Sequence, residues 1–277
     1  MSQATTPSPV AAVTASSDQK RGRLFLVPAP LDFGCEQQAP LEDALPRATI
    51  GQAAQLSHWI CENAKSTRAY LKRVDAIQAL ATPIQAQQIT ELPREVHKKG
   101  DHGDKGAPVF DARPLLAAAL QGHDMGLVSE AGMPAVADPG SSVVRAAHEL
   151  GIAVQPLVGP VSLMLALAAS GLNGQNFAFV GYLPQDASTR AARIRELERL
   201  ARDSGQSQLF IETPYRNAAL LQALLRQLKP DTRLAICSGL TLAPGCCTSL
   251  RVSDWRQRTP PLATDAAAQP AVFAIGP

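Results

Sequence analysis

The sequence predicts an α/β protein made of two α/β domains with mainly parallel sheets. Short apolar runs alternate with segments of helical periodicity along most of the chain, a pattern typical of parallel strands covered by helices on both faces. The chain has 277 residues, of which 45% are hydrophobic, and this length favours two domains of ordinary size. Glycine and proline crowd three loops that follow apolar runs, so we expect a ligand site where those strands end.

The predicted N-terminal domain spans residues 23–157 and follows a disordered tail at residues 1–22, which is rich in Ser, Thr, Ala and Pro. An apolar run at 23–28, stopped by proline, predicts a buried strand. Apolar residues at helical spacing between 53 and 74 predict one or two helices, and the polar interval at 92–109 predicts a loop. The expected remaining elements are a helix at 114–121, a strand at 125–129, a helix at 141–150 and a strand at 152–157.

The predicted C-terminal domain spans residues 158–277, and we place its boundary at Val158-Gly159-Pro160, where no helix continues. It begins with a helix of small residues at 162–170. Strands and helices then alternate as they do in the first domain. The expected strands are 177–182, 207–211, 233–238 and 271–275, and the expected helices are 189–203 and 217–228.

The three loops rich in glycine and proline lie at 27–30, 130–140 and 158–162. Glycine lets the backbone approach a flat ligand, and proline holds a loop in place without a large loss of entropy on binding. None of the loops matches a phosphate loop or the G-x-G-x-x-G pattern, which disfavours a cofactor that carries phosphate. By spacing alone, the loops fit either a ligand pocket or a set of tight structural turns.

Composition narrows the possible partners. The formal net charge is only +2, so any contact with nucleic acid must be a local patch. The five cysteines are scattered and lack the spacing of a zinc knuckle, which indicates reduced thiols in a cytoplasmic protein without a metal site. No apolar run approaches the ~18 residues that a membrane span needs.

Residues 126–140 read G-L-V-S-E-A-G-M-P-A-V-A-D-P-G. This run resembles the S-D-A-G-T-P-x-I-S-D-P-G motif of the ribosomal RNA small subunit methyltransferase I family, which 2′-O-methylates a ribose of 16S RNA. It is more similar still to a sister group that reads S-E-A-G-x-P-A-V-A-D-P-G. Further motifs of the family match in the same order along the chain, so the resemblance extends over about residues 23 to 275. These motifs are E-N-A-K-S-T-R at 62–68, V-G-P at 158–160, S-G-L-N-G-Q at 170–175, G-Y-L-P at 181–184 and F-I-E-T-P-Y-R-N at 210–217.

The resemblance implies the tetrapyrrole methylase fold, with S-adenosylmethionine bound in the cleft between the two domains. It also implies a homodimer and an RNA substrate. Backbone groups would make many of the contacts to the cofactor. Carried over by position, the cofactor-binding residues would be Pro28, Glu130, Ala131, Gly132, Val136, Val161, Ser162, Glu212, Thr213, Leu240, Thr241 and, before the last expected strand, Gln269, Pro270 and Ala271.

Methyl transfer from a sulfonium needs alignment of the reactants and a dry site more than it needs a catalytic triad. A ribose acceptor would gain from a weak base, for which Glu130, Glu62 and Asp138 are candidates. Glu130 fits either that role or a hydrogen bond within its loop, whereas the sequence around Asp138 favours a turn or a helix cap. Glu62 could instead form a surface ion pair with Arg68. We also take Arg216 as a candidate catalytic residue, either a clamp for an anionic group or a packing residue.

Two groups of cations are possible RNA contacts. The expected helix at 189–203 carries five arginines among glutamates, which favours an ordinary solvated face over an RNA surface. Histidines and lysines gather in the loop at 92–109, but no aromatic residue stands among them before Phe110, so a base-stacking platform is not indicated.

Departures from the family motif concern the acceptor more than the cofactor, since Glu130 replaces Asp and Met133 replaces Thr. The first hypothesis is therefore an RNA methyltransferase that acts on a ribosomal ribose. A methylase for a tetrapyrrole or a similar small molecule is the second hypothesis. A protein that binds S-adenosylmethionine without catalysis is the third.

Overall fold

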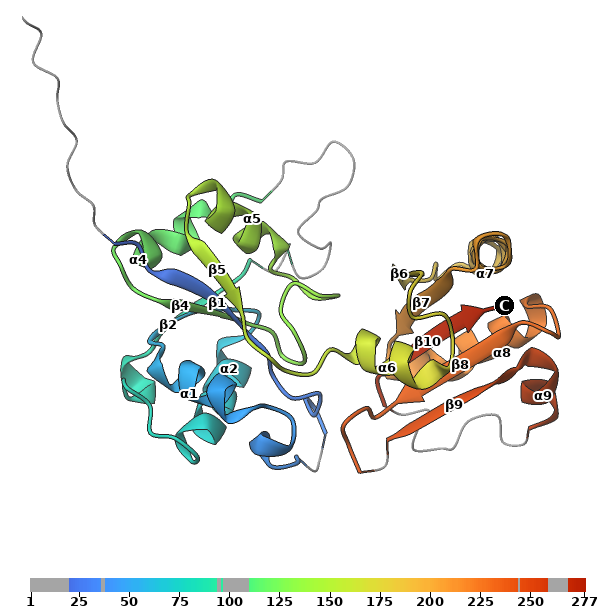
Figure 1. Cartoon of the computed structure of the whole chain (residues 1–277), viewed down its shortest axis with the longest axis horizontal. Helices are drawn as coiled ribbons and strands as arrows, with labels where there is room; N and C mark the ends of the chain where they lie inside the picture. Colours follow the sequence, from blue (N-terminus) through green and yellow to red (C-terminus); the bar gives the residue numbers. More distant parts are fainter. Residues whose placement is uncertain (1–19, 36–37, 94–95, 97–109, 244, 259–268) are drawn as a thin grey trace, which may run out of the picture.

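The computed structural model describes residues 20–35, 38–93, 96, 110–243, 245–258 and 269–277. These residues form two five-stranded sheets, with the strand orders β3-β2-β4-β1-β5 and β6-β7-β10-β8-β9. We call them the N-terminal sheet and the C-terminal sheet; Figure 1 shows them standing apart, with helix α6 (Ser162–Ser170) at their junction. The predicted tail up to residue 19 and most of the predicted loop at 92–109 lie outside the described residues.

The N-terminal sheet is entirely parallel, as predicted. Parallel strands have their carboxyl ends at one edge, so the loops that leave these strands start side by side. The strands are β1 (Arg23–Val27), β2 (His58–Cys61), β3 (Gln88–Glu91), β4 (Met125–Val128) and β5 (Ala153–Pro156).

Helices cover both faces of this sheet. Helices α1 (Arg47–Gln55) and α2 (Ala64–Asp75) share a buried apolar cluster with Phe25 and Trp59. On the opposite face, α5 (Ser141–Glu149) and the short α4 (Ala117–Leu120) pack in a second cluster. Three single turns of 3-10 helix complete this part, and they are η1 (Leu41–Asp43), η2 (Ile84–Ala86) and η3 (Arg113–Leu116).

Strand β2 corrects the expectation that 53–74 is purely helical. Its four residues lie between β3 and β4 in the sheet, and the indole of Trp59 donates a hydrogen bond of 2.9 Å to Gln87 Oε1. A buried strand this short contains too few residues to show a period, so Trp59 and Ile60 fit the helical spacing of their neighbours equally well. Strand β3 was missed for a related reason, because its four residues are mostly exposed and polar.

The C-terminal sheet is mostly antiparallel, and the prediction of mainly parallel pairing is wrong here. Only β6 and β7 pair in parallel, whereas β10 is antiparallel to both β7 and β8, and β8 is antiparallel to β9. Only residues 239–245 separate β8 from β9, which is too few for the crossover helix that a parallel pair needs. The strands are β6 (Phe177–Tyr182), β7 (Ser207–Glu212), β8 (Arg233–Ser238), β9 (Cys246–Arg251) and β10 (Ala271–Gly276).

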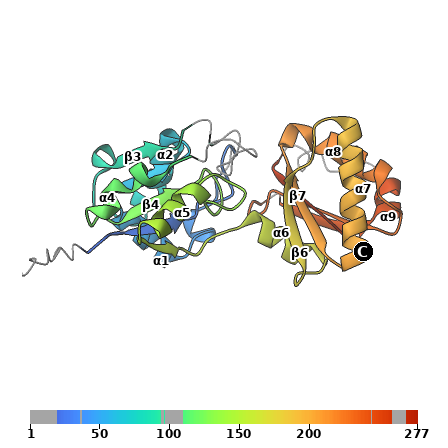
Figure 2. The same ribbon diagram turned by 90° about the horizontal axis from the view of Figure 1, so that it is seen from above.

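Helices also cover both faces of the C-terminal sheet. Helices α7 (Ala187–Ser204), α8 (Asn217–Gln227) and α9 (Val252–Gln257) share one buried cluster, in which the rings of Phe210 and Phe273 stack at 5.9 Å. Among the described residues, α6 is the helix that packs on the other face. Figure 2 shows from above that α6 lies on the side of the sheet next to the N-terminal part, so α6 separates the two sheets.

Three of the five arginines of α7 form ion pairs with neighbouring acids, while Arg190 and Arg195 donate hydrogen bonds to the Gln185 carbonyl and to Gln227 Oε1. Arg193 contacts Glu196 at 2.7 Å and Arg199 contacts Asp203 at 3.3 Å on the same helix. Arg202 contacts Asp231 at 2.9 Å. This face therefore has the solvated, charge-paired character that the sequence favours, and we do not assign it to RNA.

Candidate functional site

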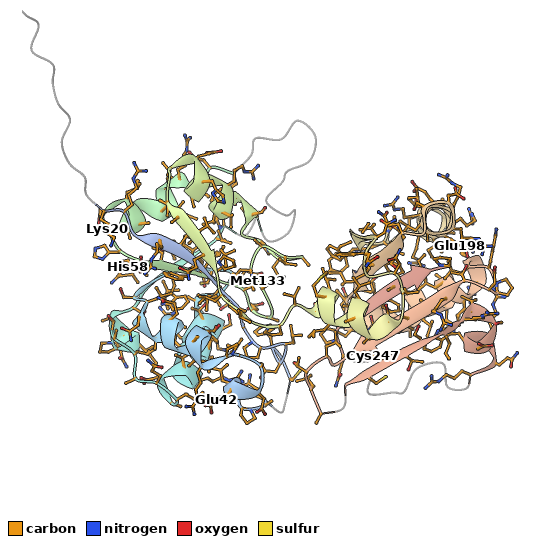
Figure 3. The ribbon with its side chains drawn as sticks, viewed as in Figure 1. Lys20, Glu42, His58, Met133, Glu198 and Cys247 are labelled. Carbon is orange, nitrogen blue, oxygen red and sulfur yellow. The ribbon has the colours of Figure 1, made fainter. Side chains whose placement is uncertain are left out.

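A cavity of about 240 Å³, which we call the first cavity, lies between the two sheets. The N-terminal part contributes Phe33 after β1 and the loop after β4, and Figure 3 shows Met133 of that loop directed toward the C-terminal sheet. Residues on its wall that the sequence predicts are Ala131, Gly132, Val136, Val161, Ser162, Glu212, Leu240, Pro270 and Ala271.

The three predicted loops meet beside this cavity. Ala29 and Gly132 form an isolated antiparallel bridge, with N–O distances of 2.9 and 3.0 Å in the two directions. A Cβ on Gly159 would stand 2.3 Å from Pro28 Cγ, so the third loop packs on the first with no space for a side chain. The loops therefore act as one backbone assembly, and the ligand-pocket interpretation replaces that of unrelated turns.

The backbone of two of the loops around the cavity is strained. Ala135 and Ala137 in the loop after β4 both have φ of 65°, and Thr241 in the turn after β8 has φ of 69°. Each such residue costs roughly 1–2 kcal/mol relative to ordinary backbone. Among the described residues these are the only non-glycine positions with positive φ, so the strain is confined to the neighbourhood of the first cavity.

Five predicted cofactor residues do not line the first cavity, and one of them is Gln269, whose carbonyl accepts a hydrogen bond of 2.8 Å from Asn217 Nδ2. Pro28 is buried against Gly159, and Glu130 lines a second, neighbouring cavity. The amide of Thr213 donates a hydrogen bond of 2.7 Å to Glu212 Oε1, and Thr241 lies in the strained turn after β8.

The cavity wall also includes residues that the sequence analysis missed. Leu31 and Phe33 follow the first glycine- and proline-rich loop by only a few positions, which was the available signal. Tyr182 lies within the G-Y-L-P motif, whose place at the end of β6 could have identified it. Ile211 and Val272 lie within strands β7 and β10 and carried no such signal.

Three carboxylates gather at the edge of the first cavity. Glu62 and Glu130 follow the neighbouring parallel strands β2 and β4, whose last residues Cys61 and Val128 are register partners. Asp138 lies on the cavity wall. Burial, together with the charges of Glu62 and Glu130, raises the pKa of Asp138 from 3.8 to about 7.

Asp138 lies in a bend before α5, which agrees with the turn alternative of the sequence interpretation, but it is not the N-cap of that helix. The N-cap of α5 is Gly140, which has no side chain of its own to make a capping hydrogen bond. Asp138 instead faces the cavity together with Tyr182, whose own pKa is raised by burial and by the charges of Asp138 and Glu212. At the start of α2, Asn63 is the cap, since its side chain accepts a hydrogen bond of 2.8 Å from the amide of Lys65.

The third predicted catalytic residue, Arg216, forms an ion pair with Glu212. The N–O distance is 2.8 Å, and Arg216 Nε donates a further hydrogen bond of 2.9 Å to the same carboxylate oxygen. The Glu212 side chain is only 5% exposed. Arg216 also lies 5.3 Å from the ring centroid of Tyr215. Its role in this structure is to neutralise a buried acid on the cavity wall.

Replacing Arg216 by Met should destabilise the protein. The substitution leaves the Glu212 carboxylate buried without its cation, which we expect to cost about 2 kcal/mol because Arg216 is itself partly exposed. Chemical denaturation followed by circular dichroism measures this change. The double variant Glu212→Gln with Arg216→Met should recover most of the loss, and an Arg216→Met variant as stable as the wild type would show that the ion pair is dispensable.

The described residues contain neither a candidate metal site nor a helix that could cross a membrane. In the described part of the chain, no group of three or more histidine, cysteine or acidic side chains could hold a metal ion. Within the same residues, no helix combines the length and the apolar character that crossing a membrane requires.

Comparison with known proteins gives one family match. Residues 64–244 match the model of the tetrapyrrole (corrin/porphyrin) methylases. Among solved structures, the methyltransferase CobJ is 16% identical with a TM-score of 0.52, and the alignment covers 92% of this chain and 94% of that one. A native uroporphyrin III C-methyl transferase from Thermus thermophilus is 15% identical with a TM-score of 0.50, over 92% and 97% of the two chains. These likenesses show the fold.

Curated relatives carry the name ribosomal RNA small subunit methyltransferase I. The protein of Halalkalibacterium halodurans is 30% identical over 82% of this chain and 68% of its own length. That of Mycobacterium tuberculosis is 37% identical over 59% of each chain. That of Vibrio cholerae is 34% identical over 47% of this chain, and the match spans only 44% of that protein.

Proposed function

Since the chain belongs to the tetrapyrrole methylase family of S-adenosylmethionine-dependent methyltransferases, we propose that it methylates a ribose 2′-hydroxyl of small-subunit ribosomal RNA. The observation that carries this proposal is the first cavity, whose wall unites most of the residues expected to bind the methyl donor. The acceptor is inferred from the relatives, which are named for ribosomal RNA.

The first cavity fits a flat, positively charged donor. Gly132 and Gly239 line the cavity and both have positive φ, so at these two positions the wall consists of backbone. Apolar side chains such as Leu240 and Val161 suit an adenine ring. Asp138 lies on the same wall, and its carboxylate form supplies negative potential that favours a sulfonium, whereas the charge of Glu212 is paired with Arg216.

S-adenosylmethionine supplies an electrophilic methyl group on a positively charged sulfur. The protein has to align a hydroxyl with that group, exclude water and accept the hydroxyl proton. We assign the proton-accepting role to Asp138, because it lies on the wall of the first cavity whereas Glu130 lines the second. Its pKa of about 7 is close to the value at which a general base works best in neutral solution.

A bound donor would also prepare this base. A positive charge beside a carboxylate lowers its pKa, and the neighbouring charges of Glu62 and Glu130 have the opposite effect. Donor binding therefore converts Asp138 from a partly protonated acid into a carboxylate. The acid becomes a competent base when a methyl group is present to be transferred.

We extend the proposal to a cytoplasmic homodimer. An enzyme that acts on ribosomal RNA works in the cytoplasm, and the family resemblance implies a second copy. Surface side chains support this assembly, since Met164 and Leu165 of α6 and Phe177 and Phe179 of β6 are between 36% and 41% exposed. Light scattering on the purified protein measures its mass, and a monomer at working concentration would contradict the dimer.

Purified protein should methylate ribosomal RNA from a strain that lacks its gene. Donor labelled on the methyl carbon should mark the small-subunit RNA of the deletion strain and not that of the wild type, where the position is already modified. Nucleoside mass spectrometry should then find the label on a 2′-oxygen. Equal labelling of the two RNAs would contradict the ribosomal acceptor, and labelling of a tetrapyrrole alone would favour a small-molecule methylase.

A further inference from the structure

Two cysteines stand opposite each other in the hairpin of β8 and β9. Cys237 and Cys247 are register partners in this antiparallel pair, so their side chains lie on the same face of the sheet. Directly opposite residues in antiparallel strands have Cα atoms about 4.5 or 5.5 Å apart, and a disulfide spans about 4.4–6.8 Å between Cα atoms. Both cysteines are free thiols in this structure. The backbone thus already has the spacing that a disulfide requires.

The two thiols differ in their exposure. Cys237 is 1% exposed and packs under α6, where its Sγ lies 3.8 Å from the carbonyl oxygen of Ala166. Cys247 is exposed, and Figure 3 shows it close to α6, at the end of the sheet nearest the N-terminal part. Burial and a hydrogen bond with Cys247 raise the pKa of the Cys237 thiol, so the two sulfur atoms are neighbours and Cys237 stays protonated. A reagent in solution therefore reaches Cys247 first.

The adjacent cysteine, Cys246, does not share this arrangement. Successive side chains of a strand point to opposite faces of the sheet, so Cys246 and Cys247 point away from each other. The Sγ of Cys246 lies 3.9 Å from Thr248 Oγ1, and its register partner is Ser238. The strand pairing therefore selects Cys237, and not the neighbour in sequence, as the partner of Cys247.

The turn that these cysteines enclose belongs to the donor site. Residues 239–245, which we call the donor-site turn, connect β8 to β9. Three of them line the first cavity, and they are Gly239, Leu240 and Leu242. Thr241 holds a φ of 69°, a conformation that persists only where the surrounding structure enforces it. A covalent link between Cys237 and Cys247 would close this turn into a ring and restrict its relaxation while no donor is bound.

We propose that Cys237 and Cys247 form a reversible dithiol–disulfide pair that sets the rigidity of the donor-site turn, with a low-molecular-weight disulfide such as oxidised glutathione as the reaction partner. Disulfides in reducing compartments are usually transient and respond to the redox state of their surroundings. The reduced form is the one that this structure shows. The inference goes beyond the proposed function, because it requires the methyl donor but not the ribosomal acceptor.

Two exchange steps close the disulfide. The Cys247 thiol loses its proton, and its sulfur attacks one sulfur of oxidised glutathione, which leaves a mixed disulfide and releases one glutathione thiolate that takes up the proton. The Cys237 sulfur then attacks the Cys247 sulfur, and the second glutathione leaves with the Cys237 proton. Two cysteine thiols are thus oxidised to one disulfide, while one glutathione disulfide is reduced to two thiols. The first step removes the negative charge of Cys247, which is one cause of the raised pKa of Cys237, so the second step becomes easier.

Incubation of the purified protein with oxidised glutathione tests the pairing. Trypsin cleaves after Arg233 and Arg251, so all cysteines of the hairpin lie in one peptide, residues 234–251. Under non-reducing conditions, mass spectrometry should find this peptide lighter by the hydrogens of one pair of thiols. The matched control Cys246→Ser should form the same disulfide, whereas Cys247→Ser should not. Loss of the disulfide in Cys246→Ser, its persistence in Cys247→Ser or its absence from the wild type would each overturn the pairing.

Calorimetry on the reduced and the oxidised wild type tests the effect on the donor site. We expect S-adenosylmethionine to bind about 5-fold more tightly to the oxidised form, because the closed turn loses less freedom on binding. Dithiothreitol should restore the lower affinity. Cys247→Ser should bind the donor equally well with and without oxidised glutathione, which separates this pair from the other thiols. An equal or weaker affinity of the oxidised wild type would overturn the role in donor binding, and since the donor alone is measured, the result does not depend on the acceptor.

Discussion

Replacing Asp138 by Asn should lower kcat for RNA methylation by about 100-fold or more, the size of effect that a positioned general base contributes. The amide has nearly the shape of the carboxylate but cannot accept a proton. Donor binding, measured by calorimetry, should weaken only modestly because Glu212 also lines the first cavity. A variant whose kcat stays within a few-fold of the wild type at pH 8 would remove Asp138 from the mechanism.

The pH dependence gives a sharper signature. With a pKa of about 7, Asp138 is mostly protonated in the free enzyme below that pH, so kcat/KM for S-adenosylmethionine should fall as the pH drops below 7. With the positive donor bound, the acid limb of kcat should lie at lower pH. Glu62→Gln and Glu130→Gln each remove one negative charge that raises the pKa of Asp138. Both substitutions should therefore move the acid limb of the pH profile of kcat/KM to lower pH. Loss of turnover in Glu130→Gln but not in Asp138→Asn would identify Glu130 as the base.

Asp138→Asn should also stabilise the folded protein in mildly alkaline solution. An acid whose pKa is raised in the folded state keeps its proton there between the ordinary value of 3.8 and about 7, so stability falls as the pH rises through this window. Asn has no such dependence. Asp138→Asn should therefore have a higher Tm than the wild type at pH 8 and a similar Tm near pH 4. Equal Tm values at pH 8 would show that ionisation of Asp138 does not destabilise the fold.

Replacing Gly132 by Val should weaken binding of S-adenosylmethionine about 100-fold, a loss of about 2.7 kcal/mol. Gly132 has φ of 72°, where a β-branched residue is strongly disfavoured. A Cβ would also stand 3.3 Å from Leu31 Cδ2 and 3.6 Å from the carbonyl oxygen of Pro160. The side chain would push apart the loops that the bridge to Ala29 joins, and the wall of the first cavity would move with them.

Gly205→Val is the matched control for this prediction. Gly205 ends α7 with φ of 66°, and a Cβ there would meet no atom within 4 Å. It therefore shares the backbone strain of Gly132 and lacks the cavity. Both variants should lose similar thermal stability, whereas calorimetry should find weakened donor binding only in Gly132→Val. Equal donor binding in the two would show that the loop tolerates a side chain at this position.

The sequence predicted those parts of the fold that local chemistry determines. Glycine and proline mark where β1 and β4 end, and the apolar runs at 177–182 and 233–238 match β6 and β8 at both ends. The pairing of β10 depends instead on which distant strands lie beside it, and its antiparallel place between β7 and β8 has no local signal.

The candidate site shows the same division. The loop after β4 was identifiable because its motif is continuous, and its residues Ala131, Gly132 and Val136 do line the first cavity. The environment of Asp138 could not be identified from the sequence, because its raised pKa comes first from burial by the fold and then from the charge of Glu62, which follows a different strand. A turn sequence around an acid looks alike whether the acid caps a helix or faces a cavity.

The central place of β10 has a consequence for how the protein is made. Ala271–Gly276 are buried throughout and hydrogen-bond to β7 on one side and to β8 on the other. While the ribosome is still translating the codons before Ala271, these two strands have no common neighbour, and the backbone edges that β10 later occupies stay unpaired. The N-terminal sheet, by contrast, is complete once Pro156 has been added. The N-terminal sheet can therefore form before the C-terminal sheet, which closes only when Ala271–Gly276 have left the ribosome.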